Sequence, residues 1–205
     1  MNQLRKHLEM VEILWVSLIE ICKQALAALP EDSAPALLNF WTYQGGGKTT
    51  FLRLVGKALS APEVDILGPW NVLGATAENL VTDILQAVDD STKMKKVVLL
   101  DNLDALLRNG DGEAFFTLEH RLILPLLERH DTLFITTGQI PITQWREYDV
   151  RIRQENHPIP ALSREEVDGP DESSLDSREI YERSLGYPQL ISWIIETPKV
   201  SDEAW

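Results

Sequence analysis

The residues best suited to chemistry are a glycine run followed directly by a lysine and two threonines, Gly45-Gly46-Gly47-Lys48-Thr49-Thr50. Glycines let the backbone N–H groups of a loop turn inward and approach an anion closely. A helix that begins at the end of such a loop adds partial positive charge at its N-terminus. There Lys48 can reach the β- and γ-phosphates of a nucleotide, and the Thr49 hydroxyl can ligate Mg²⁺. The predicted phosphate-binding residues are Gln44, Gly45, Gly46, Gly47, Lys48, Thr49 and Thr50.

One position departs from the phosphate-loop pattern, which begins with a glycine where this chain has Thr42. We expect a loop that begins with Thr42 to be stiffer or to open differently, although Gly45 and Gly46 partly restore backbone freedom. The alternative interpretation is a glycine-rich turn that only happens to precede Lys48. A second motif in the chain favours phosphate binding.

This second motif is an acidic residue at the end of an apolar run, Val97–Leu100 followed by Asp101. The run has the composition of a central β-strand. A carboxylate at the carboxyl end of such a strand faces the crevice in which α/β proteins bind ligands. Asp101 can hold Mg²⁺ there, directly or through water, so the predicted metal ligands are Thr49 and Asp101. The alternative is that Asp101 is a turn residue.

Hydrolysis also needs a group that orients or deprotonates water. Asn102 follows Asp101 and cannot act as a base, and Asp104 is the nearest suitable carboxylate. We predict a water-positioning role for Asp104, with helix capping as the alternative, and we expect slow turnover. The predicted catalytic residues are Lys48, Asp101 and Asp104. The sequence does not choose among the candidate charge stabilisers Arg108, Arg121, Arg129, Arg146, Arg151 and Arg153.

Strands alternate with helices along the chain, which predicts a parallel sheet covered on both faces. The predicted strands are 36–41, 64–67, 97–100, 132–136 and, at an edge of the sheet, 158–162. The predicted helices between them are 49–59, 77–88 with Thr76 as N-cap, 113–130 with a bend at Pro125, and 144–153. We therefore predict an α/β fold, a P-loop three-layer sandwich with a central parallel sheet, an N-terminal helix and a small C-terminal helical appendage.

The two ends of the chain are predicted to be helical. An amphipathic helix over 3–29 ends at Pro30, and it either packs on the domain or docks a partner. After Ser163 the strand pattern stops, and 176–185 and 189–195 have the spacing of short helices. We expect an N-terminal helix and linker at 1–33, a nucleotide-binding core at 34–163, and a helical segment at 164–205 that is a lid or the start of a winged-helix region.

Composition excludes several classes of protein. With 19 basic and 32 acidic residues the net charge is −13, which disfavours direct nucleic-acid binding and docking on anionic membranes. Cys22 is the single cysteine, so no intramolecular disulfide forms, and no Cys/His cluster has zinc spacing. No apolar run is long enough to span a bilayer, and the N-terminus lacks a cleavage site. We expect a cytoplasmic protein.

The two motifs resemble those of the STAND class of signal-transduction NTPases, which are relatives of the AAA+ ATPases. The NACHT-like group of that class has an aspartate, a small residue, a hydrophobic residue and a second aspartate, to which Asp101-Asn102-Leu103-Asp104 is similar. The strand Leu133–Thr137 looks like the sensor strand of the group, whose polar end senses the γ-phosphate. Thr136 or Thr137 would be that end, and Gly138-Gln139 stands where the group often has an arginine.

The tripeptide Gly186-Tyr187-Pro188 resembles the glycine-x-proline motif of the same class, in which the proline packs near adenine. A plain turn is the alternative interpretation of this tripeptide. The resemblance therefore adds Thr136 and Pro188 to the predicted nucleotide-binding residues.

The resemblance implies a switch that binds ATP or ADP with Mg²⁺, hydrolyses ATP slowly, and acts through a protein partner or self-association. Two other functions stay open. One is an interaction module that nucleotide only stabilises, which Thr42, Asn102 and the missing sensor arginine suggest. The other is a P-loop small-molecule kinase, for which Arg146–Arg153 would have to serve as the lid.

Overall fold

The computed structural model describes residues 15–29, 31, 34–161, 177–188, 190, 191 and 194. The chain divides into two compact units. The larger unit comprises Ser17–Thr42 and Lys48–Ile159, and the smaller one includes Trp15, Tyr43–Gly47 and Pro188. Residues 3–14 of the predicted N-terminal helix and most of the segment 164–205 lie outside the described residues, so the predicted domain boundaries stay a prediction.

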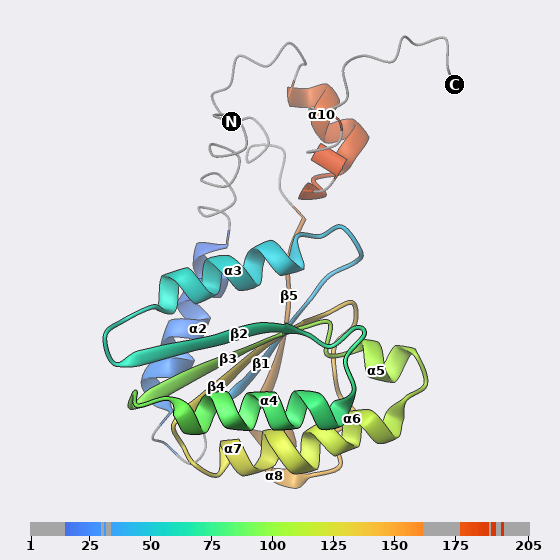
Figure 1. The fold of residues 1–205 in the computed structure, drawn as a ribbon. Helices are drawn as coiled ribbons and strands as arrows, with labels where there is room; N and C mark the ends of the chain where they lie inside the picture. Colours follow the sequence, from blue (N-terminus) through green and yellow to red (C-terminus); the bar gives the residue numbers. More distant parts are fainter. Residues whose placement is uncertain are drawn as a thin grey trace. The chain divides into compact units, whose positions relative to one another are not determined.

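The larger unit is built on a five-stranded sheet in the order β2-β3-β4-β1-β5, with every pairing parallel (Figure 1). Strand β1 (Leu37–Trp41) lies between β4 (Thr132–Gly138) and β5 (Gln154–Pro158). Strand β3 (Lys95–Asp101) lies between β2 (Val64–Asn71) and β4. Because all strands run the same way, the carboxyl ends of β1, β3 and β4 meet at one edge of the sheet. This confirms the predicted parallel sheet.

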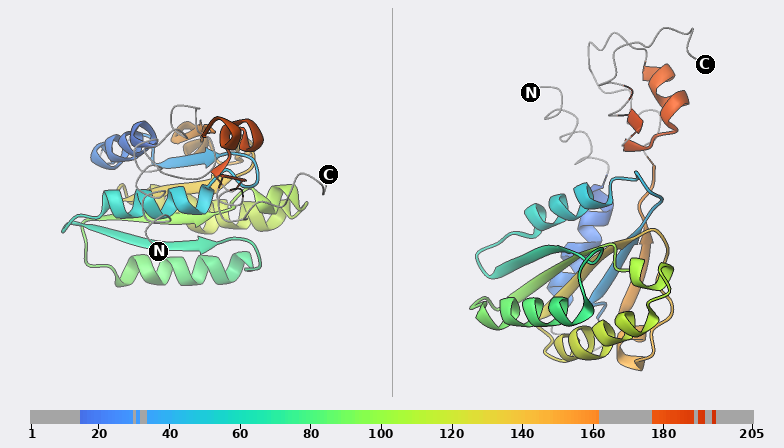
Figure 2. Two further views of the ribbon diagram at one scale, coloured as in Figure 1. Left: turned by 90° about the horizontal axis from the view of Figure 1, so that it is seen from above. Right: turned by 45° about the vertical axis from the view of Figure 1, so that its right-hand side comes forward.

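Helices cover both faces of the sheet. Helix α3 (Lys48–Leu59) packs against β2, β3 and β4 on one face. The opposite layer contains α4 (Ala77–Asp90), α6 (Gly112–Leu118) and α7 (Leu124–Leu127), as Figures 1 and 2 show. A Cβ on Gly56 would lie 3.1 Å from Leu99 Cδ1, so the glycine allows α3 to lie close to the sheet. The three-layer α/β sandwich is therefore confirmed.

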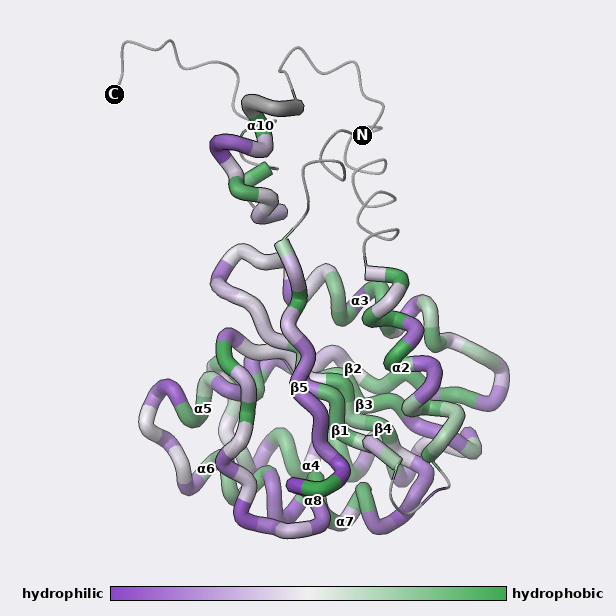
Figure 3. Tube along the Cα trace, turned by 180° about the vertical axis from the view of Figure 1, so that it is seen from behind, coloured by the Kyte–Doolittle hydropathy of each residue, from purple (hydrophilic) through white to green (hydrophobic). Residues whose placement is uncertain are grey.

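The core lies at the centre of the sheet. Val97 and Val98 in β3, and Leu133, Phe134 and Ile135 in β4, are fully buried. These residues form near-continuous apolar runs because helices cover both faces of a parallel sheet. Figure 3 shows β1, β3 and β4 as hydrophobic and β5 as hydrophilic.

The position of the last strand differs from the prediction. An edge strand was expected at 158–162, but β5 is the polar segment Gln154–Pro158. A side-chain contact explains why a polar strand pairs with β1, because Asn39 Nδ2 donates to Asn156 Oδ1 at 2.8 Å. The predicted helix at 144–153 is correspondingly reduced to α8 (Tyr148–Ile152).

The helix expected over 113–130 is not bent at Pro125 but interrupted before it. After α6 the chain forms a π-helical segment, η1 (Glu119–Ile123), and then α7. Leu124 N–H donates to Glu119 C=O, the long hydrogen bond that defines a π turn. Pro125 has no N–H of its own, and the wider turn just before it accommodates this missing donor.

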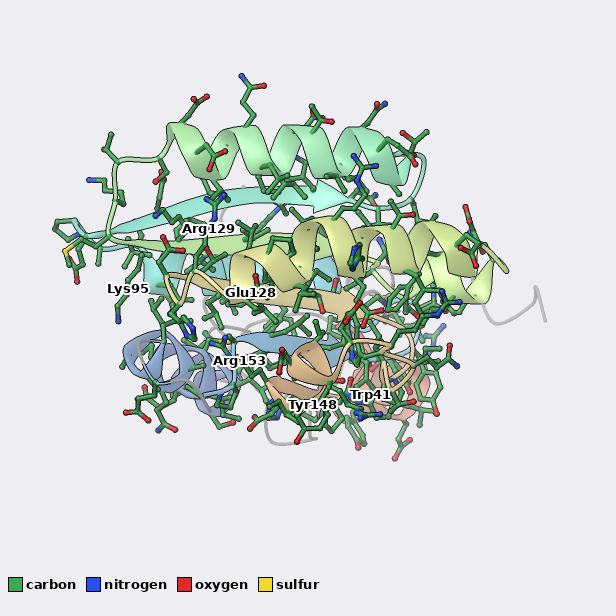
Figure 4. All side chains as sticks on the ribbon, turned by 90° about the horizontal axis from the view of Figure 1, so that it is seen from below. Trp41, Lys95, Glu128, Arg129, Tyr148 and Arg153 are labelled. Carbon is green, nitrogen blue, oxygen red and sulfur yellow. The ribbon has the colours of Figure 1, made fainter. Side chains whose placement is uncertain are left out.

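The described part of the N-terminal helix is α2 (Val16–Ala28), which buries Leu18, Ile19 and Cys22. Lys95 reaches the end of α2 and donates to Leu26 C=O at 2.6 Å (Figure 4). Burial raises the pKa of the Cys22 thiol to about 12, so this cysteine is a poor nucleophile. The described helix therefore packs on the domain, the first of the two predicted alternatives.

None of the described helices combines the length and apolar character that a membrane span requires.

Helix α4 has the predicted N-cap, and this cap can be tested. The Thr76 side chain accepts from Asn79 N–H at 3.3 Å. We expect Thr76→Ala to lower the free energy of unfolding by about 1 kcal/mol because one helix N–H loses its acceptor. Urea denaturation measures the change. Thr82→Ala is the matched control, because the Thr82 hydroxyl donates within α4, to Glu78 C=O. Equal losses in the two variants would contradict the capping role.

Candidate functional site

The glycine loop belongs to the smaller unit and has the backbone that its sequence predicts. Gly45 and Gly47 both have φ of 83°, a conformation that residues with a side chain rarely adopt. Gly46 N–H closes a turn onto Tyr43 C=O at 3.1 Å. A side chain on either of these two glycines would strain the loop, so the glycines there are a requirement of the backbone.

Gly47 is also in close contact with two residues of the same unit. A Cβ on Gly47 would lie 2.9 Å from Trp15 Cη2 and 3.6 Å from Pro188 Cγ. The structure therefore brings the predicted site residue Pro188 to the glycine loop. It also brings Trp15, which is 1% exposed and which sequence reasoning missed. Helical spacing had assigned Trp15 only to an apolar stripe, and spacing carries no information about this contact.

Lys48 begins α3 and is buried. Its side chain donates from Nζ to Thr42 C=O at 3.2 Å. Burial lowers the pKa of Lys48, the nearby carboxylates of Asp101 and Asp104 raise it, and the Arg108 guanidinium lowers it further. The net direction is downward, so the folded protein holds the positive charge of Lys48 at a cost.

Asp101 ends β3 and receives a hydrogen bond on each carboxylate oxygen. Thr49 Oγ1 donates to Oδ2 at 2.6 Å, and Thr137 Oγ1 donates to Oδ1 at 2.5 Å. The two predicted metal ligands, Thr49 and Asp101, are thus in direct contact, and Thr137 joins them from the end of β4. One carboxylate connects α3, β3 and β4.

The donor set at Asp101 fits Mg²⁺ in one particular way. Mg²⁺ prefers oxygen ligands and is usually held by one or two carboxylates, together with substrate phosphates and water. Thr49 and Asp101 supply a hydroxyl and a carboxylate. Among the described residues no group of three or more His, Cys, Asp or Glu side chains could hold a metal by itself. A metal at Asp101 would therefore need phosphate oxygens to complete its ligands.

Asp104 lies directly after β3 and is fully buried. Its Oδ2 accepts from Gln139 backbone N–H and from Arg108 Nε, both at 2.8 Å. Its Oδ1 has no hydrogen-bond partner in the described part of the chain. Asp104 stands at the N-cap of α5 (Ala105–Arg108) but makes no side-chain capping bond, so the helix-capping alternative is wrong. A Cβ on Gly138 would lie 2.7 Å from Asp104 Oδ1, so only glycine fits beside this carboxylate.

Asn102 separates the two acidic residues and turns away from them. Its φ of 62° is left-handed, a conformation that asparagine tolerates better than most residues. Its side chain donates to Asn71 Oδ1 at 3.2 Å. The left-handed backbone at Asn102 turns the chain sharply between Asp101, at the end of β3, and Asp104.

The two threonines at the end of β4 have different surroundings. Successive side chains of a strand point to opposite faces of the sheet. Thr137 donates to Asp101, whereas Thr136 donates to Asn39 Oδ1 at 3.0 Å inside the sheet. The structure therefore does not bring the predicted residue Thr136 to the Asp101 cluster, and it does bring Thr137. Of the remaining predicted residues, Gln44 is exposed in the loop and Thr50 is half-buried in the first turn of α3.

Comparison with known proteins agrees with this architecture. The model of the family described as "ATPase family associated with various cellular activities (AAA)" matches residues 38–141, about half of the chain. That segment contains the glycine loop, Asp101, Asp104 and Thr137. No curated protein matches the chain significantly.

Several solved structures share the fold at low sequence identity. A complex of HORMA, CdnC and Trip13 from E. coli MS115-1 matches with a TM-score of 0.58 and 13% identity, over 83% of this chain and 73% of that chain. Drosophila ORC bound to DNA matches with a TM-score of 0.54 and 15% identity, over 80% and 48%. C. elegans PCH-2 matches with a TM-score of 0.53 and 13% identity, over 74% and 44%. This chain thus spans less than half the length of the ORC and PCH-2 chains.

The cost of the buried lysine leads to a prediction with two readouts. Because the pKa of Lys48 lies below its usual 10.5, stability rises with pH between the lowered pKa and 10.5, where the unfolded chain binds more protons. We expect Lys48→Met to raise or preserve the unfolding temperature of the nucleotide-free protein, because it removes a desolvated charge. The same variant should bind nucleotide at least about tenfold more weakly, because it loses a charged phosphate donor.

Thermal unfolding and nucleotide titration measure the two effects. Lys57→Met, on the exposed side of the same helix, is the control and should bind as the wild type does. Unchanged nucleotide affinity in Lys48→Met would rule out the phosphate role of Lys48.

The adjacent threonines of β4 provide a matched pair of substitutions. Thr137→Val removes a donor to the Asp101 carboxylate, and we expect it to weaken Mg²⁺-dependent nucleotide binding about tenfold. Thr136→Val removes a donor to Asn39 and should cost about 1–2 kcal/mol of stability without changing nucleotide affinity. Calorimetric titration in the presence and absence of Mg²⁺ separates the two. If Thr136→Val is the variant that loses affinity, Thr136 is the sensor residue after all.

Proposed function

This chain belongs to the AAA family of ATPases, and from that premise we propose that it is an ATP- and Mg²⁺-operated switch that hydrolyses ATP slowly. Family membership makes it a nucleotide-binding NTPase domain, and the finer assignment rests on the site. The contact that carries the proposal is the double hydrogen bond of Thr49 and Thr137 to Asp101. A ligand that alters the bonds of Asp101 acts at once on α3, β3 and β4. A signal-transduction NTPase of the STAND, NACHT-like group is the form of switch that the spacing of Asp101 and Asp104 supports.

In this proposal each residue of the motif has a distinct task. The N–H groups of Gly45–Gly47 and the side chain of Lys48 bind the phosphates, and the chain runs directly from one into the other. Thr49 and Asp101 hold Mg²⁺, which when bound neutralises charge on the β- and γ-phosphates. The buried position of Lys48 supports this role, because a desolvated cation gains more from an anionic ligand than a hydrated one.

Slow hydrolysis is proposed because only one carboxylate is suited to position water. Asn102 carries no base and bonds to Asn71. Asp104 has one oxygen engaged by Gln139 and Arg108, which leaves Oδ1 to orient a water molecule. A buried carboxylate held by two donors is fixed in position, which suits it to orient a water molecule.

The kinase alternative finds little support in the arginines that were its candidate lid. Arg153 is buried and donates to Ala34 C=O at 3.2 Å and to Leu127 C=O at 2.7 Å (Figure 4). Arg146 stacks on the Phe116 ring, with its guanidinium carbon 3.3 Å from the ring centroid. Both arginines are thus bound into the larger unit. A non-hydrolysing module remains the second candidate, and the engagement of Asp104 is the observation that favours it.

The proposed partner is a protein or a second copy of this chain. The similar E. coli structure is a complex of several proteins, and the similar Drosophila structure is bound to DNA. For this chain we propose a protein partner, because a net charge of −13 repels a phosphate backbone. A reducing cytoplasmic setting is proposed from the single cysteine.

The decisive test compares wild type with Asp104→Asn. We expect Asp104→Asn to release phosphate from ATP at least about tenfold more slowly, because the water loses its orienting carboxylate, while ATP still binds. We also expect hydrogen exchange of the larger unit to differ between the ATP and ADP complexes, since a switch requires different affinity for its two states. Phosphate release, nucleotide titration and exchange mass spectrometry measure these effects.

Asp111→Asn is the matched control, because Asp111 caps α6 through Ala114 N–H and asparagine caps equally well. The non-hydrolysing module would be established instead if wild type and Asp104→Asn both released phosphate no faster than the background rate. Hydrogen exchange would then also be identical in the ATP and ADP complexes. Phosphate transfer to an added metabolite in preference to water would establish the kinase.

A further inference from the structure

Arg108, the last residue of α5, is held at the site by a single hydrogen bond. Its Nε donates to Asp104 Oδ2 at 2.8 Å, and its side chain is 29% exposed. An arginine carries five N–H donors in a planar fork. Within the described residues the guanidinium makes no other hydrogen bond, so its terminal N–H groups are unused. A cation with unused donors is available for an anionic ligand.

Asp104 fixes the orientation of this guanidinium. The carboxylate is fully buried and also accepts from Gln139 N–H, so it cannot turn to follow the arginine. The carboxylate occupies the space beside Gly138 that a side chain at that position would fill. Arg108 is therefore preorganised by a rigid acceptor, which reduces the entropy it loses when it binds a second anion.

The charges around Lys48 indicate which anion that is. Lys48 is within electrostatic reach of Asp101, Asp104 and Arg108, and Arg108 is bonded to Asp104, so the group contains two cations and two carboxylates. The carboxylates already balance the cations when no nucleotide is bound. The terminal phosphate of ATP adds negative charge that ADP lacks, and beside Mg²⁺ the only side chain so far assigned to balance it is Lys48. At the end of β4 the residues are Gly138 and Gln139, which supply no positive charge.

We propose that Arg108, oriented by Asp104, contacts the terminal phosphate of a bound nucleoside triphosphate and thereby makes the site prefer ATP to ADP. The two oxygens of Asp104 then have separate tasks, since Oδ2 orients Arg108 and the buried Oδ1, which has no partner among the described residues, is left for a water molecule. This inference rests on the proposed function, because it needs a nucleotide bound at Lys48 and Thr49. It adds the residue that distinguishes the two states of the switch.

The test measures the affinities of a non-hydrolysable ATP analogue and of ADP, each with Mg²⁺, for wild type and Arg108→Gln. We expect the affinity for the analogue to fall about tenfold or more, because a charge-assisted hydrogen bond is lost. The affinity for ADP should stay within about twofold of wild type, since ADP has no terminal phosphate at this position. Arg129→Gln is the matched control, because Arg129 pairs with Asp89 on the surface at 2.7 Å (Figure 4).

The outcomes separate the inference from the proposed function. The role of Arg108 is overturned if the ratio of the analogue affinity to the ADP affinity is the same in Arg108→Gln as in wild type. This holds whether the two affinities are both unchanged or both reduced. Failure of wild type to bind either nucleotide overturns the proposed function itself. If Arg108→Gln does not fold, the double variant Asp104→Asn/Arg108→Gln removes both charges of the pair. Compared with wild type, it should show the same selective loss of analogue affinity, and an unchanged ratio of the two affinities overturns the inference.

Discussion

The carboxylate of Asp101 is the constraint on which the site depends. Each of its oxygens accepts a hydroxyl, one from Thr49 at the start of α3 and one from Thr137 at the end of β4. These three residues are distant in sequence, and the parallel sheet brings them together because the carboxyl ends of β3 and β4 lie side by side. Hydrogen bonds to an ionised group are stronger than neutral ones. The same contact that would bind a metal and sense a phosphate therefore also helps to hold the helix against the sheet.

A buried group of charges makes this arrangement costly in the absence of a ligand. Desolvation depresses the pKa of Lys48, and Asp104 keeps one buried oxygen without a partner among the described residues. Both features are unfavourable in a protein that only has to fold. An anion at Lys48 would offset part of this cost, because a desolvated cation gains more from a further negative charge than a hydrated one does. The stability that the buried charges cost can in this way contribute to ligand affinity.

Much of the fold could be predicted from local pattern, because the buried runs Val97–Leu100 and Leu133–Ile135 are apolar throughout and a glycine loop followed by lysine and threonine is typical of phosphate binding. The polar strand Gln154–Pro158 could not, since its place beside β1 depends on pairing and on the Asn39–Asn156 contact rather than on hydrophobicity. The π turn at Glu119 also lacks a clear sequence signal. In the candidate site, Lys48, Thr49, Asp101 and Asp104 were predicted from motif and spacing. The sequence named Thr137 only as one of two sensor candidates and Arg108 only as one of six arginines, and the choice among them needed the contacts with Asp101 and Asp104. The contact of Trp15 with Gly47 had no signal in the sequence.

Neighbouring side chains at the end of β4 point to opposite faces of the sheet and make contacts of different kinds. Thr136 belongs to a polar network with Asn39 and Asn156, which sets the register of the edge strand β5 against β1. Thr137, the next residue, belongs to the charged cluster around Asp101. Two neighbouring residues therefore belong to different networks, Thr136 to the one that joins the strands and Thr137 to the one around Asp101. A strand cannot shift by one residue without exchanging its two faces. The position of β4 that places Thr136 on Asn39 is therefore the same one that places Thr137 on Asp101.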